Sequence, residues 1–287
     1  MNEMPSPESR SAPEPHALDV VAPARIAMLV EEVGVRKCAM GLLQTLTLAT
    51  LAGAFIALGA LFYTVVVTGS ELGFGPTRLL GGMAFSLGLV LVVVGGAELF
   101  TGNSLIVMAW ADGRVETGAL LRNWGLVYLG NLAGALGTVL LVHMAGTMTI
   151  SGGGIAATAR AIAEAKVAIP PLEAFARGIL CNVLVCLAVW MCFAANSVPG
   201  KVLAIMFPIS AFVALGFEHS VANMYLIPIG ALQAGGTIGV GGFLANLLPV
   251  TAGNMLGGGG LVALVYWLVY LRPQRIGERA AAGLNRP

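Results

Sequence analysis

Two apolar segments of this chain are too long to be single straight transmembrane helices. The chain has six apolar segments, and the core of a bilayer is crossed by about 20 helical residues. The second and fifth segments have 33 residues each. As unbroken helices they would extend about 50 Å, against a hydrocarbon core of about 30 Å. Both are therefore predicted to be interrupted. The six segments are 41–69, 79–111, 123–146, 178–195, 202–234 and 243–271.

The same motif, Gly-x-Glu-x4-Asn, lies inside each of the two overlong segments. It reads Gly-Ala-Glu-Leu-Phe-Thr-Gly-Asn at 96–103 and Gly-Phe-Glu-His-Ser-Val-Ala-Asn at 216–223. A second pattern, Asn-x6-Gly-Asn-x2-Gly, follows each copy at nearly the same spacing, at 123–134 and at 246–257. Two patterns repeated in the same order indicate an internal repeat of two halves.

Three spans in each half force the second half to insert upside down relative to the first. Both termini then lie on one side of the membrane, together with 11 of the 15 Lys and Arg residues. The positive-inside rule makes that side cytoplasmic. The predicted fold class is thus all-α and integral to the membrane, with six transmembrane helices as two inverted three-helix repeats and with helices 2 and 5 interrupted. Inverted halves with matching broken helices indicate a permeation site between them.

Composition supports the membrane class and excludes several others. Hydrophobic residues make up 57% of the 287 residues and charged residues 10%, as in integral membrane proteins. A formal net charge of +1 gives no indication of nucleic-acid binding. The four cysteines form no CxxC pair and have no metal-ligand spacing, so they are interpreted as reduced packing residues. Neither a metal nor a cofactor is expected.

Segments outside the six spans divide the rest of the chain. Residues 1–24 are rich in Pro, Ser, Ala and Glu and are predicted to be a disordered cytoplasmic tail. Residues 25–37 have apolar residues at helical spacing, which predicts either an amphipathic helix on the membrane surface or a solvated cap on the first span. The first repeat is assigned to 38–146 and the second to 178–271. An extracytoplasmic connection at 147–177 and a cytoplasmic tail at 272–287 complete the chain.

The polar residues of the two motifs are the candidate stabilisers of the breaks. An interrupted helix leaves backbone N–H groups without partners, and such groups must be satisfied within a membrane. The carboxylates of Glu98 and Glu218 are expected to accept hydrogen bonds from these groups, although they could also bind substrate. Asn103 and Asn223 belong to the same motifs and are assigned the same stabilising role.

Half-helix N-termini at the breaks favour an anion as the transported species. Thr101 adds a hydroxyl group, His219 adds a titratable nitrogen, and Asn131 and Asn254 add amides from the third and sixth spans. Ionisable side chains at membrane depth are costly and indicate function. No acidic ring follows the remaining path, so an anion is favoured over a cation.

Two other functional classes also have about six spans. A neutral-solute channel of the aquaporin type would share the inverted halves, but paired Asn-Pro-Ala motifs are absent. An intramembrane serine protease would use a serine and a histidine, yet Ser220 directly follows His219. Adjacent residues do not easily bring a base and a nucleophile into contact, and no Gly-x-Ser-x-Gly context is present.

Six sequence blocks together point to a known family: 85–89, 96–101, 178–182, 187–190, 216–223 and 249–254. They resemble the formate/nitrite transporter family, and the resemblance covers roughly residues 25–272. The block Gly-Phe-Glu-His-Ser is highly specific for this family. The resemblance implies an aquaporin-like protomer, assembled as a homopentamer in the cytoplasmic membrane of a prokaryote, with one pore in each protomer.

The resemblance also implies a role for particular residues along the pore. Leu89, Phe100 and Phe212 would form apolar constrictions. Thr101 would belong to the loop that interrupts the second span, and His219 would be the central histidine.

The resemblance also implies roles for three further residues. Lys166 would be the lysine of the vestibule, and Asn182 and Asn254 would line the path. The implied substrate is a small monovalent anion, formate first, with nitrite or hydrosulfide as alternatives, and protons are implied as partners. Glu98 stands where many formate-transporting members have Asp, so the residues leave the choice of anion open.

His219 suggests how an anion could cross apolar constrictions. Removing the water shell of an anion costs tens of kcal/mol in the idealised limit, whereas the neutral acid is far cheaper to move. His219 is the side chain in the apolar spans, apart from His143 near the end of the third, that titrates near neutral pH. We therefore expect a weak-acid anion to be transiently protonated at His219.

Overall fold

The computed structural model describes residues 21–281, and within them every regular element is helical. The N-terminal segment predicted to be disordered lies almost entirely outside this range. Six helical stretches are long and apolar enough to cross a membrane, as predicted. They are α2 (Leu42–Val67), α3 (Phe74–Gly95), α5 (Thr117–Met144), α7 (Pro171–Ala194), α8 (Val198–Leu215) and the stretch Val240–Gly277, which begins with α10 (Val240–Met255).

Both overlong segments are interrupted at their Gly-x-Glu-x4-Asn motifs, which confirms the prediction from length. Helix α3 ends at Gly95 with Gly96 as its C-cap, and the chain continues through a short non-helical stretch into η1 (Gly102–Ile106) and α4 (Val107–Ala111). Helix α8 ends at Leu215 with Gly216 as its C-cap, and α9 (Ser220–Gln233) begins after a gap of four residues. The φ angles of Gly96 and Gly216 are 79° and 74°. Glycine ends a helix in this left-handed conformation without the steric penalty of a Cβ atom.

Helix α1 (Pro23–Ala39) covers the first interruption. Its apolar face, with Ile26, Ala27 and Val30, is buried against the region of η1 and α4. The segment 25–37 lies within α1, and its apolar stripe packs on the protein itself. Arg114 donates to Glu31 on the same helix at 3.0 Å. Burial is the main cause that raises the pKa of the Glu31 carboxyl group.

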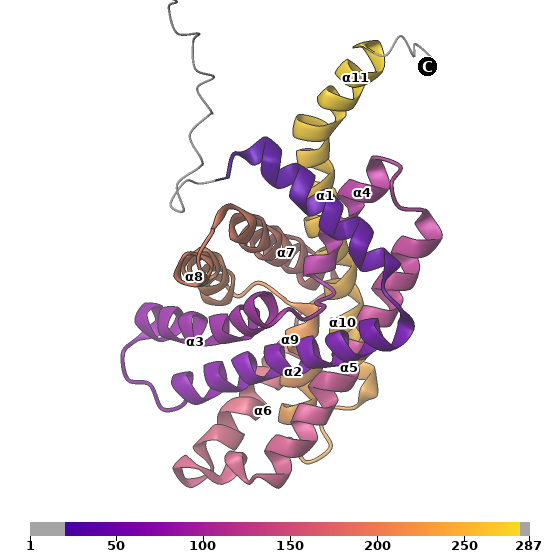
Figure 1. Ribbon diagram of the computed structural model, residues 1–287. Coiled ribbons are helices and arrows are strands. Elements are labelled where there is room, and N and C mark those ends of the chain that lie inside the picture. The colour runs from indigo at the N-terminus through magenta and orange to yellow at the C-terminus, as the bar shows by residue number, and fades with distance from the viewer. Residues whose placement is uncertain (1–20, 282–287) are drawn as a thin grey trace, which may run out of the picture.

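Regular structure extends beyond the predicted spans in two places. The connection at 147–177 contains η2 (Thr147–Thr149), η3 (Ser151–Gly153) and the 14-residue helix α6 (Gly154–Val167), which packs against α9. At the end of the described chain, two π-helical segments, η4 (Leu256–Leu264) and η5 (Trp267–Leu271), continue α10 into α11 (Arg272–Ala281). Hydropathy missed α6 and α11 because charged residues interrupt their apolar positions. In Figure 1, α1 and α11 lie at one end of the molecule and α6 at the other.

Two helix pairs pack backbone against backbone through glycines. A Cβ atom on Gly134 of α5 would lie 1.9 Å from the Thr50 carbonyl oxygen of α2, far inside contact distance. A Cβ atom on Gly257 would lie 2.2 Å from the Ile179 carbonyl oxygen of α7. Only glycine permits such approaches. The pair α2 and α5 therefore has a counterpart in α7 and the stretch that follows α10.

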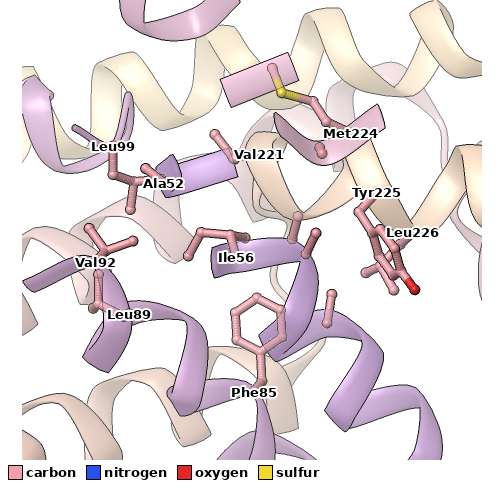
Figure 2. Packing of buried hydrophobic residues seen from close by; sticks show 14 of the residues in the cluster. Ala52, Ile56, Phe85, Leu89, Val92, Leu99, Val221, Met224, Tyr225 and Leu226 are labelled. Carbon is pink, nitrogen blue, oxygen red and sulfur yellow. The ribbon is translucent and has the colours of Figure 1, made fainter. Parts of the chain in front are cut away.

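One apolar cluster surrounds the interruptions. Figure 2 shows Ile56 of α2, Phe85 of α3 and Tyr225 of α9 within this cluster, together with Leu99 from the first interruption. All four side chains are at least 96% buried. Polar groups in such surroundings need partners, because an unpaired buried group is destabilising. A pseudo-two-fold relation between the two halves stays a prediction.

Candidate functional site

A lysine and two asparagines surround the carboxylate of the first interruption. Glu98 is 5% exposed and accepts from Lys37 Nζ at 2.7 Å and from Asn103 Nδ2 at 2.8 Å. Asn103 also donates to Asn123 Oδ1 at 2.9 Å. Asn123 in turn donates to the Lys37 carbonyl oxygen at 3.2 Å. The buried charge of Glu98 is thereby paired with Lys37 and hydrogen-bonded.

A lysine and two asparagines also surround the carboxylate of the second interruption. Glu218 accepts from Lys166 Nζ at 2.8 Å and from Asn223 Nδ2 at 2.7 Å. Asn223 donates to Asn246 Oδ1 at 2.7 Å, and Asn246 donates to the Lys166 carbonyl oxygen at 2.8 Å. Lys37 of α1 is thus the counterpart of Lys166 of α6. Sequence reasoning found Lys166 through the resemblance and missed Lys37.

Asparagines of the third and sixth spans hold the interrupted backbones. The Phe100 N–H donates to Asn131 Oδ1 at 2.9 Å, and Asn131 Nδ2 donates to the Glu98 carbonyl oxygen at 2.9 Å. In the second interruption, the Ser220 N–H donates to Asn254 Oδ1 at 2.9 Å, and Asn254 Nδ2 donates to the Glu218 carbonyl oxygen at 3.0 Å.

The expectation that Glu98 and Glu218 accept from freed backbone N–H groups is wrong. An amide side chain carries both a donor and an acceptor, so it can satisfy an N–H and a C=O of one interruption together. A carboxylate only accepts, and in each half it pairs with a lysine. Glu98, Glu218, Asn103 and Asn223 connect each interruption to that lysine.

His219 and Thr101 bring the two interruptions into contact. His219 Nε2 lies 3.0 Å from Thr101 Oγ1, and His219 Nδ1 accepts from the Ala222 N–H at 3.1 Å, which caps the N-terminus of α9. Because Nδ1 accepts, the neutral imidazole carries its hydrogen on Nε2 and donates it to Thr101. The Thr101 hydroxyl hydrogen then remains to be donated to another group. Both side chains are at least 97% buried.

Two pockets approach this contact from opposite ends. The α1-side pocket has a volume of about 280 Å³ and the α6-side pocket about 380 Å³. His219 lines the α6-side pocket, whereas Leu89 and Leu99 line the α1-side pocket. Polar or charged side chains lining the α1-side pocket include Lys37, Glu98, Asn103 and Lys201, and those lining the α6-side pocket include Arg78, Lys166, Arg177, Glu218 and Asn223.

Comparisons with known proteins show to which family a chain with this site belongs. The family model for formate/nitrite transporters matches residues 24–268. The chain belongs to the formate/nitrite transporter family. It is 43% identical to the formate channel FocA of Escherichia coli strain K12, over 88% of this chain and 96% of FocA. It is also 40% identical to a probable formate transporter of Methanothermobacter thermautotrophicus, over 80% of this chain and 89% of that protein.

Solved structures agree with this assignment. A pentameric formate channel with formate bound superposes with a TM-score of 0.75 and 41% sequence identity, over 80% of this chain and 98% of that chain. An ion channel of the family superposes with a TM-score of 0.78 and 30% identity, over 85% and 98%. The protein is thus a multi-pass membrane transport protein and not an enzyme. The intramembrane protease alternative is therefore set aside. His219 Nε2, which would have to act on a serine in such an enzyme, faces Thr101 instead.

The implied constriction residues of this family member fall in different places. Phe212 lines the α6-side pocket with Phe85, their ring centroids lie 5.5 Å apart, and Phe212 stacks on His219 at 5.9 Å. Leu89 lines the α1-side pocket with Leu99. Phe100 is absent from the lining of both pockets, and its ring packs edge-on against Tyr128 at 4.8 Å.

Sequence reasoning missed Phe85 and Leu99, although both had a signal. Phe85 lies one helical turn before Leu89 on α3, so the two share a face. Leu99 follows Glu98 as His219 follows Glu218, so it occupies the place of the histidine in the other motif.

Two arginines of the α6-side pocket also escaped sequence reasoning. Arg78 donates to the carbonyl oxygens of Val213 at 2.7 Å and Ala214 at 3.2 Å, and Arg177 donates to that of Gly216 at 3.3 Å. They bind the C-terminal end of α8, where a helix leaves carbonyl groups without partners and carries a partial negative charge. Within residues 21–281, no group of three or more His, Cys, Asp or Glu side chains could hold a metal ion.

Proposed function

We propose that this protein is a channel for small monovalent weak-acid anions, with formate as the first candidate. The observation that carries the proposal is the Thr101–His219 contact of 3.0 Å between two pockets, in a chain that belongs to the formate/nitrite transporter family. Relatives named as formate channels support formate as the substrate. Nitrite and hydrosulfide are also small anions of weak acids and remain alternatives.

The proposed path runs from one pocket to the other through the interruptions. From the α6-side pocket, an anion passes Phe85 and Phe212 and reaches His219 and Thr101. It then passes Leu89 and Leu99 into the α1-side pocket. The aromatic and leucine side chains exclude water but offer no compensating charge, so a bare anion faces a high barrier there. Phe100 does not face the path, and it supports the wall of the path by packing on Tyr128.

Transient protonation at His219 would lower this barrier. A proton passes from the His219 imidazolium to the carboxylate of formate, which leaves a neutral imidazole and formic acid. The acid crosses the apolar constriction, and His219 takes up a new proton from the side from which the anion came. One proton therefore crosses with each anion.

The hydrogen bonds of His219 set a condition on this step. The imidazolium carries hydrogens on both ring nitrogens, while Nδ1 here accepts from the Ala222 N–H. Protonation of His219 therefore requires the Ala222 N–H to give way. In the neutral state, the Nε2–H bond to Thr101 leaves the threonine hydroxyl hydrogen directed to an anion. Thr101 is thus the proposed first donor to the substrate.

Assembly and orientation are proposed from the relatives and from the charges. The solved formate channel is pentameric, which supports a homopentamer with one pore in each protomer. Both termini are proposed to face the cytoplasm of a prokaryote, across its inner membrane. The α1-side pocket would then open to the cytoplasm, and the α6-side pocket would open to the other side.

Uptake competition tests the choice of substrate. Radiolabelled formate is added to the outside of proteoliposomes, together with an excess of nitrite, hydrosulfide, acetate or chloride. We expect nitrite and hydrosulfide to compete with formate, and chloride to have little effect. Uptake that is no faster than in protein-free liposomes would reject the proposed function.

Lys166→Gln is expected to slow uptake from the α6-side mouth severalfold at low ionic strength. Lys166 pairs with Glu218 at 2.8 Å, so its removal leaves an uncompensated carboxylate that repels anions at the mouth. The difference from the parent is expected to shrink at high salt, because salt screens the field. Uptake of radiolabelled formate at two salt concentrations measures it.

A double variant and a second lysine serve as controls for this effect. Lys166→Gln with Glu218→Gln removes both charges and is expected to recover most of the initial rate. Lys201→Gln alters the other pocket and is expected to leave uptake from the α6 side near the parent rate. An equal loss of rate in the single and the double variant would mean that charge is not the cause.

A further inference from the structure

We infer that Asn182 is a positioning residue for Thr101 and that Gly258 keeps open the space that Asn182 needs. The inference rests on the proposed function, in which Thr101 is the donor to the anion. It concerns how this donor is held at hydrogen-bond distance from His219. Neither residue lines either of the two pockets, so both would act through Thr101.

Asn182 joins three segments through one amide group. It is fully buried on α7. Its Nδ2 lies 3.2 Å from the Thr101 carbonyl oxygen, 3.2 Å from Ser104 Oγ and 2.6 Å from the Asn254 carbonyl oxygen. Cys186, one turn further along α7, also donates to the Thr101 carbonyl at 3.4 Å. The backbone of Thr101 is therefore fixed from the α7 side.

The contact with Asn254 extends this link to the second interruption. The side chain of Asn254 binds the Ser220 N–H and the Glu218 carbonyl group, on both sides of His219. Asn182 thus connects the segment that carries Thr101 with the residue that holds the backbone of His219. The distance between Thr101 Oγ1 and His219 Nε2 depends on both segments. One amide group therefore couples the two sides of that hydrogen bond.

Gly258 has no side chain, and the Asn182 amide occupies the space next to it. It lies in the π-helical segment η4. A Cβ atom at Gly258 would lie 2.4 Å from Asn182 Nδ2, 2.7 Å from Cys186 Sγ and 2.7 Å from Ser104 Cβ. Nδ2 has two hydrogens and three acceptors within hydrogen-bond distance, so it cannot move away without losing at least one of these contacts. An alanine at position 258 would therefore displace the amide.

The other half of the chain lacks this arrangement. Asn131 binds the Ala49 carbonyl oxygen as Asn254 binds that of Gly178. Four residues after Ala49 and Gly178, the two helices carry Gly53 and Asn182, respectively. A Cβ atom on Gly53 would lie 2.0 Å from the Asn131 carbonyl oxygen, so that backbone packs directly on glycine.

A second exchange between the halves offsets part of the volume difference made by the first. Four residues after Asn131 and Asn254, the chain carries Ala135 and Gly258, respectively. One half therefore combines glycine with alanine, and the other combines asparagine with glycine. An asparagine needed only to pack the helices together would be expected in both halves. The asparagine instead occurs in the half where its amide can reach Thr101, which points to a role in transport.

The double variant Asn182→Gly with Gly258→Ala tests this inference. It gives the second half the pair present in the first, so the volume removed at 182 is partly returned at 258. We expect the double variant to melt below the parent but above Gly258→Ala alone, because only the contact of the new Cβ atom with Asn182 Nδ2 is relieved, whereas those with Cys186 Sγ and Ser104 Cβ remain. Formate flux of the double variant is expected to fall about tenfold or more, because a displaced donor no longer meets the anion. Chloride flux relative to formate is expected to rise.

Hydrogen exchange provides a readout that does not depend on the substrate. In the double variant, peptides that cover residues 98–106 are expected to exchange about tenfold faster than in the parent, as opening of that segment becomes easier. Peptides from α2 and α5 serve as an internal control and are expected to be unchanged. Formate flux, selectivity and exchange all equal to those of the parent would overturn the inference. A parent protein that moves no formate would instead reject the proposed function, and exchange at 98–106 would still decide the role of Asn182.

Discussion

His219→Phe is expected to abolish the proton-coupled flux of formate. Phenylalanine retains a ring that can stack on Phe212, which packs against His219 at 5.9 Å, but it can neither donate to Thr101 nor carry a proton. Without a proton at this point, an anion would have to cross the apolar constriction with its charge, at a cost that the surrounding leucines and phenylalanines cannot offset. Acidification of the liposome lumen on a formate gradient, followed with an internal pH dye, measures the effect.

Two further variants separate the chemistry of His219 from its structural role. His219 caps α9 through the Ala222 N–H, and loss of such a cap costs about 0.5–2 kcal/mol. His219→Asn retains a cap acceptor but cannot titrate, so it is expected to unfold near the parent temperature and to show no proton-coupled flux. His143→Phe, on an exposed part of α5 outside both pockets, is expected to acidify liposomes as the parent does. Parent-like acidification by His219→Asn would show that the histidine is not the proton donor.

Gly134→Ala is expected to prevent α2 and α5 from packing in their present positions. The new Cβ atom would meet the Thr50 carbonyl oxygen at 1.9 Å. Both atoms belong to backbones within regular helices, so the helices themselves must separate. Overpacking of this kind costs about 1–3 kcal/mol or more. Asn131, on the same face of α5, would also move away from the Ala49 carbonyl oxygen that it binds at 2.8 Å. We expect a large loss of thermal stability in detergent and little folded protein.

The matched control for this variant lies one turn further along the same helix. A Cβ atom on Gly137 would meet nothing within 4 Å. Gly137→Ala is therefore expected to be neutral or stabilising, by up to about 1 kcal/mol, because alanine favours the helix. Equal melting temperatures for Gly134→Ala and the parent would contradict the close approach of the two helices.

The interruptions could be predicted because their signals are local. A helix of 33 residues exceeds the bilayer thickness whatever its neighbours are, and the glycine before each glutamate indicates where it ends. The partners of the glutamates could not be predicted in the same way. Lys37 lies 61 residues before Glu98, and Lys166 lies 52 residues before Glu218. Both lysines belong to polar segments whose sequence does not indicate which span they pack against.

The division of roles between amides and carboxylates also required the structure. From the sequence, Glu98 was expected to satisfy backbone groups of the first interruption, and Asn131 was expected to contribute an amide to the anion site. Which side chain pairs with a charge and which binds the backbone depends on which of them has a lysine within reach. The packing of α1 on η1 places Lys37 next to Glu98. The positions of Phe85 and Leu99 were within reach of sequence reasoning, since helical spacing and the repeat pointed to both.

A direct comparison of formate with chloride tests the central claim, that anions cross as weak acids at the Thr101–His219 contact. Proteoliposomes with an internal pH dye receive equal inward gradients of radiolabelled formate or chloride, with and without a proton carrier. We predict that formate enters with one proton per anion and that chloride enters at a rate near that of protein-free liposomes. Formate influx that leaves the internal pH unchanged, or chloride influx as fast as that of formate, would contradict the account.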